Sequence, residues 1–277
     1  DQIQNLIKGT HAPILVTGGH RTGTTWVGKM LAACGETAYI SEPLNARHRP
    51  GVLRASTPYW YTYICPDNES QFLPGLSDLL SYRYHLADEL RSIRSRKDFM
   101  RAGRDAGIFL KGRCLRQRPL LKDPFAIFSA TWFAQKLGFQ VVITIRHPAA
   151  FASSLKRLDW PFDFSDLLAQ PLLLRDGVEP FREEMEAAVA AAAKGTQDIL
   201  GQASLLWKII YSMVDRQRQQ QPGFHIVRHE DLSLDPIAGF RQLYSALGLS
   251  FSPKAMHSIQ NASSSENPAE LGRKKVH

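Results

Sequence analysis

One stretch near the start of the chain, Ile14–Trp26, constrains the fold more than any other. Its apolar beginning predicts a buried strand, a turn with glycines follows, and a helix is expected to begin at Thr24. Gly18, four further residues, Gly23 and two threonines almost reproduce a phosphate-binding P-loop, but Thr24 stands where nucleotide-hydrolysing loops have a lysine. The loop therefore keeps the backbone groups that bind phosphate and lacks the cation that bridges the β- and γ-phosphates of a triphosphate.

Apolar segments that end in polar residues recur along the chain, with helical patterns between them. We expect strands at Ile14–Thr17, Thr37–Ile40, Pro119–Leu121, Gln140–Ile145 and Phe224–Val227. We expect helices at Thr24–Ala33, Ser77–Asp105, Ala126–Leu137, Ala149–Leu158, Glu183–Ala193, Ser204–Gln219 and Pro236–Leu247, the last as the C-terminal helix. This alternation predicts an α/β fold with a P-loop-like central parallel sheet of about five strands flanked by helices.

The length of 277 residues suits one large α/β domain, and we expect a single domain over residues 1–277. The chain starts at Asp1 without a methionine and stops in a basic segment, which leaves truncation at both ends open. Two stretches rich in proline and aromatic residues, 46–76 and 160–180, are predicted to be long insertions. They are candidates for lids or substrate walls, with surface packing as the alternative.

Composition limits the kinds of partner. The formal net charge is +8, but the densest basic clusters, 91–97 and 113–118, are not interleaved with aromatic residues as in nucleic-acid platforms. We therefore expect no nucleic-acid partner. No apolar run approaches the roughly 18 residues of a membrane span, so no span is expected. Three separated cysteines and nine histidines without ligand spacing give no support to a disulfide framework or a metal site, and they favour a reducing compartment.

Polar residues follow each of the predicted strands. In an open parallel sheet, ligands bind beyond the carboxyl ends of the strands. That rule gathers residues far apart in sequence, namely the glycine loop, Glu42, Lys122, Arg146 and His229. One site would then hold several cations, a carboxylate and a phosphate cradle.

The glycine loop has the parts of an anion cradle. Gly19 and Gly23 permit close approach, and the amides of residues 22–25 point at an anion from a helix N-terminus. Arg21 is placed to neutralise charge on a leaving-group oxygen. Hydroxyl donors come from Thr22, Thr24 and Thr25. An ordinary glycine-rich turn is the alternative.

A second segment, 146–154, has the residues for a second phosphate. Arg146 ends a strand, Pro148 suits the first turn of a helix, and Ser154 follows eight residues after the arginine. The two side chains are expected to face one anion, the arginine as a planar fork and the serine as a hydroxyl donor. A strand-end salt bridge is the alternative for Arg146.

Together these segments resemble the sulfotransferases that use 3′-phosphoadenosine-5′-phosphosulfate (PAPS). Residues 20–26 look like their 5′-phosphosulfate loop, 146–154 like their 3′-phosphate segment, and 227–249 like a stretch late in many members. The resemblance covers nearly the whole chain. It leans toward the carbohydrate, Golgi-type and bacterial branch, because Arg21 replaces a lysine and Ser41–Leu44 looks like the Glu-Pro segment of that branch.

The resemblance implies roles for particular residues. Glu42 would be the catalytic base that takes the acceptor's proton, and Arg21 and Lys122 would stabilise charge on the departing phosphate. Glu42 merely pairing with Arg21 or Lys122 is the alternative, and His20, His147 and His229 compete for the role of base. Implied cofactor contacts are His20, Arg21, Thr22, Gly23, Thr24, Thr25, Trp26, Arg146 and Ser154, with Arg273 and Lys274 on a C-terminal basic loop.

The function expected from this resemblance is sulfuryl transfer from PAPS to a hydroxyl acceptor, a carbohydrate or another small natural product, without a metal. Two alternatives stay open: a P-loop-type kinase or NTPase, and a non-catalytic protein that binds PAPS or its product, adenosine 3′,5′-bisphosphate (PAP). A bacterial cytoplasmic enzyme is favoured over a trimmed Golgi luminal domain. The oligomeric state is not readable from the residues.

Overall fold

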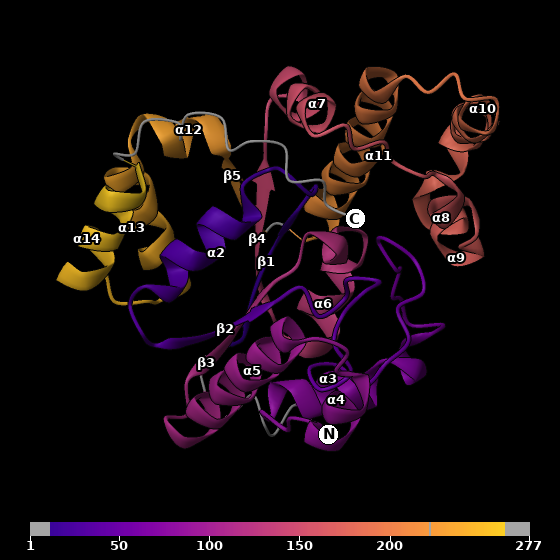
Figure 1. The fold of residues 1–277 in the computed structure, drawn as a ribbon. Coiled ribbons are helices and arrows are strands. Elements are labelled where there is room, and N and C mark those ends of the chain that lie inside the picture. The colour runs from indigo at the N-terminus through magenta and orange to yellow at the C-terminus, as the bar shows by residue number, and fades with distance from the viewer. Residues whose placement is uncertain (1–11, 222, 264–277) are drawn as a thin grey trace.

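A parallel sheet forms the centre of the molecule in the computed structural model, which describes residues 12–221 and 223–263 (Figure 1). Its strand order is β2-β3-β1-β4-β5. The strands are β1 (Ile14–Gly18), β2 (Thr37–Ser41), β3 (Arg118–Lys122), β4 (Gln140–Ile145) and β5 (His225–Arg228). All four neighbouring pairs are parallel, so the predicted α/β fold with a five-stranded parallel sheet is confirmed.

Side chains of the central strands alternate between two hydrophobic cores. Leu15, Leu121 and Ile143 contribute to the larger core, whereas Ile14 and Val142 face the smaller one. Because successive residues of a strand point to opposite faces, both faces of this sheet must be covered. Helices α2, α13 and α14 contact one another on one side of β1, and α6, α7 and α11 lie on the other side (Figure 1).

The longer helices have the following bounds: α2 (Thr24–Ala32), α3 (Leu73–Leu80), α4 (Leu86–Ser92), α5 (Arg96–Cys114), α6 (Ala130–Leu137), α7 (Pro148–Arg157), α10 (Arg182–Ala193), α11 (Ile199–Gln220), α12 (His229–Leu234), α13 (Pro236–Leu247) and α14 (Pro253–Ser263). The shorter ones are η1 (Glu69–Gln71), η2 (Pro124–Ser129), α8 (Ser165–Leu168), α9 (Pro171–Leu173), η3 (Leu174–Val178) and η4 (Glu179–Phe181). None of the helices in the described part of the chain is long and apolar enough to cross a membrane.

Two helix predictions were wrong. The stretch 77–105 is not one long helix, because α3, α4 and α5 are separated by turns. Tyr82 in the first turn has a left-handed backbone (φ 55°), and its hydroxyl donates to the carbonyl of Gln117 at 2.7 Å. In the second turn, Ser95 begins a new helix by accepting a hydrogen bond from the amide of Asp98. The helix at Pro236–Leu247 is not the last one either, since α14 follows it.

Candidate active site

The glycine loop lies directly between β1 and α2, as the sequence predicted. Gly23 precedes α2 with a left-handed backbone (φ 98°), and a Cβ there would lie 2.4 Å from the ring of His229. A Cβ on Gly18 would lie 2.4 Å from the hydroxyl of Thr144 on β4. The loop therefore needs glycine at both positions, once for its backbone angle and once for its packing against β4.

The N-terminus of α2 is open. No side chain caps it, and the first amides of any helix lack intrahelical acceptors. Thr25 is exposed, whereas Thr24 is buried, and within residues 12–263 neither hydroxyl has a hydrogen-bond partner. These free donors sit where the helix dipole favours negative charge.

Thr22 has a different place from its two neighbours. Its hydroxyl donates to the carbonyl of Gly19 at 2.6 Å and lies 2.7 Å from the hydroxyl of Thr144, and its amide donates to the same carbonyl at 3.2 Å. Both polar groups of Thr22 are thus used inside the protein. Its part in the site is to hold the loop on β4.

Arg21 and Arg146 are in contact where the loop meets the end of β4, and the charge of Arg157 on α7 also acts on Arg21. Arg21 Nε donates to Ser154 Oγ at 3.2 Å, and Arg146 Nη1 donates to the carbonyl of Arg21 at 3.0 Å. Burial lowers the pKa of Arg21, and the positive charges of Arg146 and Arg157 lower it further. Among the described residues, none of these three arginines has a carboxylate within salt-bridge distance. We call Arg21, Arg146 and Arg157 the arginine cluster.

The position of Arg146 is fixed by neighbouring helices and strands. Trp207 on α11 donates its indole N–H to the carbonyl of Arg146 at 2.9 Å, and Tyr211 donates its hydroxyl to the carbonyl of Thr144 at 3.0 Å. Arg146 Nε is buried and has no hydrogen-bond partner among the described atoms. A buried donor without a partner is costly, so this group marks a place for an acceptor from outside the described residues.

Arg157 was not among the site residues predicted from the sequence. It lies at the end of α7, three residues after Ser154, and residues three apart share a helix face. That spacing was the only available signal, because the run of residues around it reads as an ordinary helix end with a basic residue.

Glu42 and Lys122 form an ion pair at the ends of β2 and β3. The Lys122 side chain is 3% exposed and that of Glu42 is 32% exposed. Asn45 Nδ2 donates to the second carboxylate oxygen, Oε2, at 2.9 Å. Of the two pairings that the sequence left open for Glu42, the structure has the one with Lys122. The carboxylate nonetheless keeps free lone pairs and an exposed edge.

Asp123 fixes the backbone around Glu42. Its Oδ2 accepts from the amide of Leu44 at 2.5 Å, its Oδ1 accepts from the amide of Phe125 at 2.9 Å, and Glu42 donates its own amide to the carbonyl of Lys122 at 2.7 Å. Glu42 is held in a left-handed conformation (φ 53°), as is Arg21 (φ 67°). Non-glycine residues in this region are uncommon and concentrate at functional sites. Sequence reasoning missed Asp123, because its role depends on contacts across two strands.

His20 is a neutral, packed residue. Its Nδ1 lies 2.7 Å from the hydroxyl of Tyr61, and its ring contacts those of Phe151, Trp160 and Phe162. Burial lowers the pKa of His20 to about 4, and the charge of Arg21 acts in the same direction. An imidazole of this kind carries no charge for a phosphate at neutral pH.

The remaining predicted residues lie on the flanks of the loop. The ring of Trp26 packs on those of His229 and Phe240 at 5.4 and 5.2 Å. His229 has a lowered pKa because of burial and of the nearby Arg146. His147 accepts from the amide of Ala149 at 3.2 Å and so caps α7. In the described part of the chain, no contact of the Trp26 ring or of the His147 ring involves a residue of the arginine cluster.

Arg273 and Lys274 lie outside the described residues. Within the described part, no cluster of three or more histidine, cysteine, aspartate or glutamate side chains is arranged to hold a metal ion.

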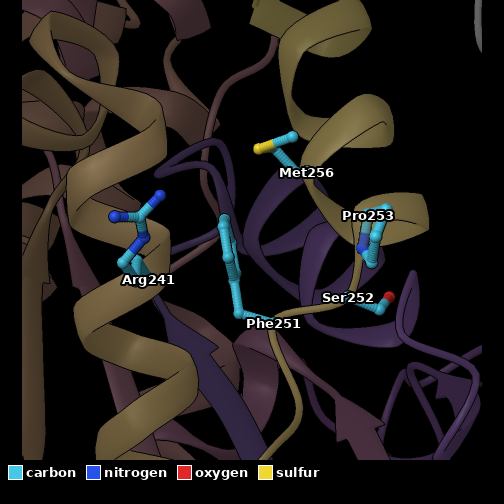
Figure 2. Close-up of a pocket in the computed structure, with 5 residues that line it drawn as sticks. All are labelled: Arg241, Phe251, Ser252, Pro253 and Met256. Atoms are coloured by element: carbon cyan, nitrogen blue, oxygen red, sulfur yellow. The ribbon is translucent and has the colours of Figure 1, made fainter.

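A surface pocket between α13 and α14 holds none of the predicted site residues (Figure 2). Its lining consists of Arg241, Phe251, Ser252, Pro253 and Met256. The guanidinium of Arg241 lies over the ring of Phe251, 5.4 Å from its centroid. The cation in the lining of this pocket is therefore already in a cation–π contact.

Comparison with known proteins identifies the family of this chain. A family model described as "Sulfotransferase family" matches residues 13–253. The structure is similar to the sulfotransferase domain from the curacin biosynthetic pathway, with 15% identity over 89% of this chain and 77% of that one and a TM-score of 0.46. It is also similar to sulfotransferases from Alicyclobacillus acidocaldarius (14% identity, 92% of each chain, TM-score 0.43) and Mycobacterium tuberculosis (17%, 94% of this chain and 76% of that one, 0.43). A comparison with curated proteins finds no match. Because the family model spans most of the sequence, the chain belongs to the sulfotransferase family.

Proposed function

We propose that this sulfotransferase takes its sulfuryl group from PAPS and transfers it to a hydroxyl of a small acceptor, such as a carbohydrate or another natural product. The observation that carries the proposal is the arginine cluster, which lies beside an open helix N-terminus and, among the described residues, has no carboxylate within salt-bridge distance. A ligand with two separate phosphate-like groups supplies the missing negative charge.

The two ends of such a donor suit different parts of the site. The amides at the start of α2 and the hydroxyls of Thr24 and Thr25 suit the 5′-phosphosulfate. Arg146 and Ser154 suit the 3′-phosphate, because a guanidinium fork and a hydroxyl donor make strong, directed hydrogen bonds to phosphate. The side chain of Arg21 donates to Ser154 and its carbonyl accepts from Arg146, so Arg21 connects the glycine loop to the residues that suit the 3′-phosphate.

Sulfuryl transfer at this site would be an in-line displacement. The acceptor oxygen forms a bond to sulfur while the bond from sulfur to the bridging oxygen of PAPS breaks, and that electron pair stays on the 5′-phosphate of PAP. Glu42 takes the proton of the acceptor hydroxyl, with Lys122 and Asn45 orienting its carboxylate. Arg21 and the helix amides stabilise the charge that develops on the departing phosphate, with Lys122 as a candidate second cation.

The alternatives have less support from the same geometry. A kinase or NTPase needs a cation at position 24 of the loop and a carboxylate for Mg²⁺, whereas Thr24 occupies that position. A non-catalytic binding protein has no need of Glu42, which is held in a left-handed backbone with part of its side chain exposed.

Thermal unfolding of the full chain with nucleotides tests the donor. We expect PAP to raise the Tm, adenosine 5′-monophosphate to raise it much less, and Mg-ATP to have little effect, because a ligand that binds only the folded state stabilises it by RT ln(1 + [L]/Kd) and the tighter ligand therefore gives the larger shift. Transfer of ³⁵S from labelled PAPS to a panel of hydroxyl acceptors tests the reaction. A larger shift with Mg-ATP than with PAP would overturn the assignment of the donor.

A further inference from the structure

Helix α5 lies at the periphery of the molecule, where it packs on β2 and beside α4 (Figure 1). The residues that it buries are Ala102, Asp105, Phe109 and Gly112. They recur at intervals of three or four residues and so lie on one side of the helix. The opposite side of α5 faces away from the protein.

This outward side carries large apolar side chains. Phe99 and Leu110 are each 66% exposed, and Met100 is 74% exposed. Phe99 and Leu110 lie on one line of the helix, because the eleven positions between them make about three turns. Gly103 and Gly107 lie on the same side, and a Cβ on either would have no described atom within 4 Å. We call Phe99, Met100, Gly103, Gly107 and Leu110 the apolar stripe. Exposed apolar residues are normal when scattered singly, whereas these share one helix face.

Positive charge borders the apolar stripe. All six basic residues of α5 are exposed, namely Arg96, Lys97, Arg101, Arg104, Lys111 and Arg113. The helix has two acidic residues and both are engaged, since the N-cap hydroxyl donates to Asp98 Oδ2 at 2.9 Å and Arg104 Nη2 donates to Asp105 Oδ1 at 2.8 Å. Among the described residues, neither Lys97 nor Lys111 has a carboxylate within salt-bridge distance.

The positive charge continues beyond both ends of α5. The two densest basic clusters of the sequence, 91–97 and 113–118, adjoin the start and the end of this helix. Arg96 and Lys97 lie in its first turn, where the helix dipole disfavours positive charge. Charges at that position and apolar side chains in water do not stabilise the fold, so they indicate contact with something outside the described chain.

We propose that α5 binds the surface of an anionic lipid bilayer, with the apolar stripe between the headgroups and the acyl chains and the basic residues on lipid phosphates. Helices that lie in the plane of a membrane interface combine phenylalanine and leucine on one face with lysine and arginine beside them. The long basic side chains can reach the phosphates while their aliphatic stems stay next to the apolar stripe. The proposal does not depend on which donor or acceptor the enzyme uses.

A lipid surface suits these residues better than a nucleic acid or an acidic protein does. A nucleic acid would leave Met100 and Leu110 against charged backbone, and its stacking platforms need several aromatic rings. Protein interfaces are depleted in lysine and depend on anchors that fill pockets, whereas α5 presents one convex helix with two glycines in the middle of its apolar stripe. A fluid bilayer adapts to such a surface without a matching groove.

Co-sedimentation of the full chain with lipid vesicles tests the proposal. The vesicles contain either phosphatidylcholine alone or equal parts of phosphatidylcholine and phosphatidylglycerol. At about 0.1 M NaCl we expect binding to the anionic vesicles to be about 10-fold or more tighter than to the neutral ones. The bound fraction should fall at about 1 M NaCl, because the Debye length decreases from about 10 Å to about 3 Å.

Two double variants separate the apolar and the charged contributions. Phe99→Ser with Leu110→Ser removes two apolar side chains, and Lys97→Gln with Lys111→Gln removes two charges. Each pair should weaken binding to the anionic vesicles by about 10-fold or more. All four side chains are exposed, so the Tm of each variant should stay close to that of the unchanged protein.

Matched control variants make the same chemical changes elsewhere on the surface. Leu200→Ser with Leu234→Ser changes two exposed leucines on α11 and α12, and Lys194→Gln with Lys254→Gln changes two exposed lysines. Both control variants should bind the anionic vesicles as tightly as the unchanged protein does.

Several outcomes would overturn the proposal. One is the absence of binding to anionic vesicles, and another is unchanged binding in either double variant of α5, because the contact would then lie elsewhere or need only charge. Binding to poly-L-glutamate without binding to vesicles would point instead to an acidic protein. A dimer in light scattering that becomes a monomer in Phe99→Ser with Leu110→Ser, again without vesicle binding, would point to a second copy of this chain.

Discussion

The two halves of the active site differ in how their charges are balanced. On the proposed donor half, the charges of Arg146 and Arg157 lower the pKa of Arg21, and no carboxylate in the described chain lies within salt-bridge distance of these three arginines. On the acceptor half, Glu42 is paired with Lys122, and the buried Asp123 accepts two backbone hydrogen bonds. The arginines of the first half have no ion-pair partner among the described residues, whereas the charged groups of the second half are paired or hydrogen-bonded within the protein.

This difference shows how the work of the site is divided. In the proposed function, phosphate groups would relieve the repulsion that Arg146 and Arg157 exert on Arg21, so the charge of the donor half would contribute to affinity for the nucleotide. The acceptor half has no such need, and its bonds serve to hold one carboxylate in one position before any substrate arrives. Preorganisation of this kind is what lowers a barrier without cost at the moment of reaction.

Glu42→Gln should break the acceptor half alone, with the largest effect. We expect kcat to fall by about 10²–10⁴-fold, because the amide cannot take the acceptor's proton. The rise in Tm caused by PAP should stay within error of the unchanged protein. Steady-state kinetics with labelled PAPS and thermal unfolding measure the two quantities.

The matched control is Glu183→Gln, at an exposed carboxylate on α10. It should change neither turnover nor PAP binding. Full activity of Glu42→Gln would remove Glu42 from the role of base and leave only its pairing with Lys122.

Asp123→Asn tests the acceptor half through the pH dependence of stability. Burial raises the pKa of Asp123 to about 7, above its unfolded value of 3.8, against the opposing effect of its hydrogen bonds from the amides of Leu44 and Phe125. The folded state therefore holds this proton more tightly, so the stability contributed by the protonated form is full below about pH 4 and is lost as pH rises through 7. Asparagine cannot titrate, so the variant lacks this dependence.

The measurement is urea unfolding of both proteins at pH 4, 5.5 and 7. The free energy of unfolding of the wild type minus that of Asp123→Asn should decrease over this range by an amount on the order of a few kcal/mol. A difference that stays constant with pH would show that Asp123 titrates alike in the folded and unfolded states. Carboxylates that do not interact with Asp123 cancel in the difference, whereas the charge of Glu42, which also raises the pKa of Asp123, is part of the measured effect.

Arg146→Ala tests the donor half. Loss of one charged hydrogen-bond donor to phosphate should weaken PAP binding by about 1.5–3 kcal/mol, or roughly 10- to 150-fold. Calorimetric titration with PAP measures it, and Arg113→Ala, at an exposed arginine on α5, serves as the control. If adenosine 5′-monophosphate loses as much affinity as PAP, Arg146 does not act on the 3′-phosphate.

Much of the fold was predictable because the strands of a parallel sheet are buried on both faces and read as continuous apolar runs. The bounds of β4, Gln140–Ile145, agree with the sequence prediction at both ends. The breaks in 77–105 were not predictable, since they depend on where Tyr82 packs. Its ring lies against Gly112, where a Cβ would lie 2.5 Å from the ring, and Gly112 is far along the chain from the break at Tyr82.

The positions of site residues were predictable where they followed from one sequence segment, and were not predictable where they depend on contacts between two distant segments. The sequence placed the glycine loop, Glu42, Lys122 and Arg146 at the same edge of the sheet, because each follows a strand. The contribution of Asp123 and the meeting of Trp60 with Trp160 needed the folded chain, since the partners are far apart in sequence.

Of the substitutions in the donor half, Ser154→Ala should weaken PAP binding least. Ser153→Ala provides a closely matched control. The serine hydroxyl accepts from Arg21 Nε at 3.2 Å and is buried, whereas Ser153, the preceding residue of α7, is exposed. Both variants make the same chemical change in the same helix, so any effect on helix propensity cancels between them. Ser154→Ala should weaken PAP binding by about 0.5–1.5 kcal/mol, as for a single uncharged hydrogen bond, and Ser153→Ala should leave it unchanged. Equal losses in the two variants would mean that the Ser154 hydroxyl neither orients Arg21 nor contacts the nucleotide, and that affinity in the donor half comes from the arginine charges alone.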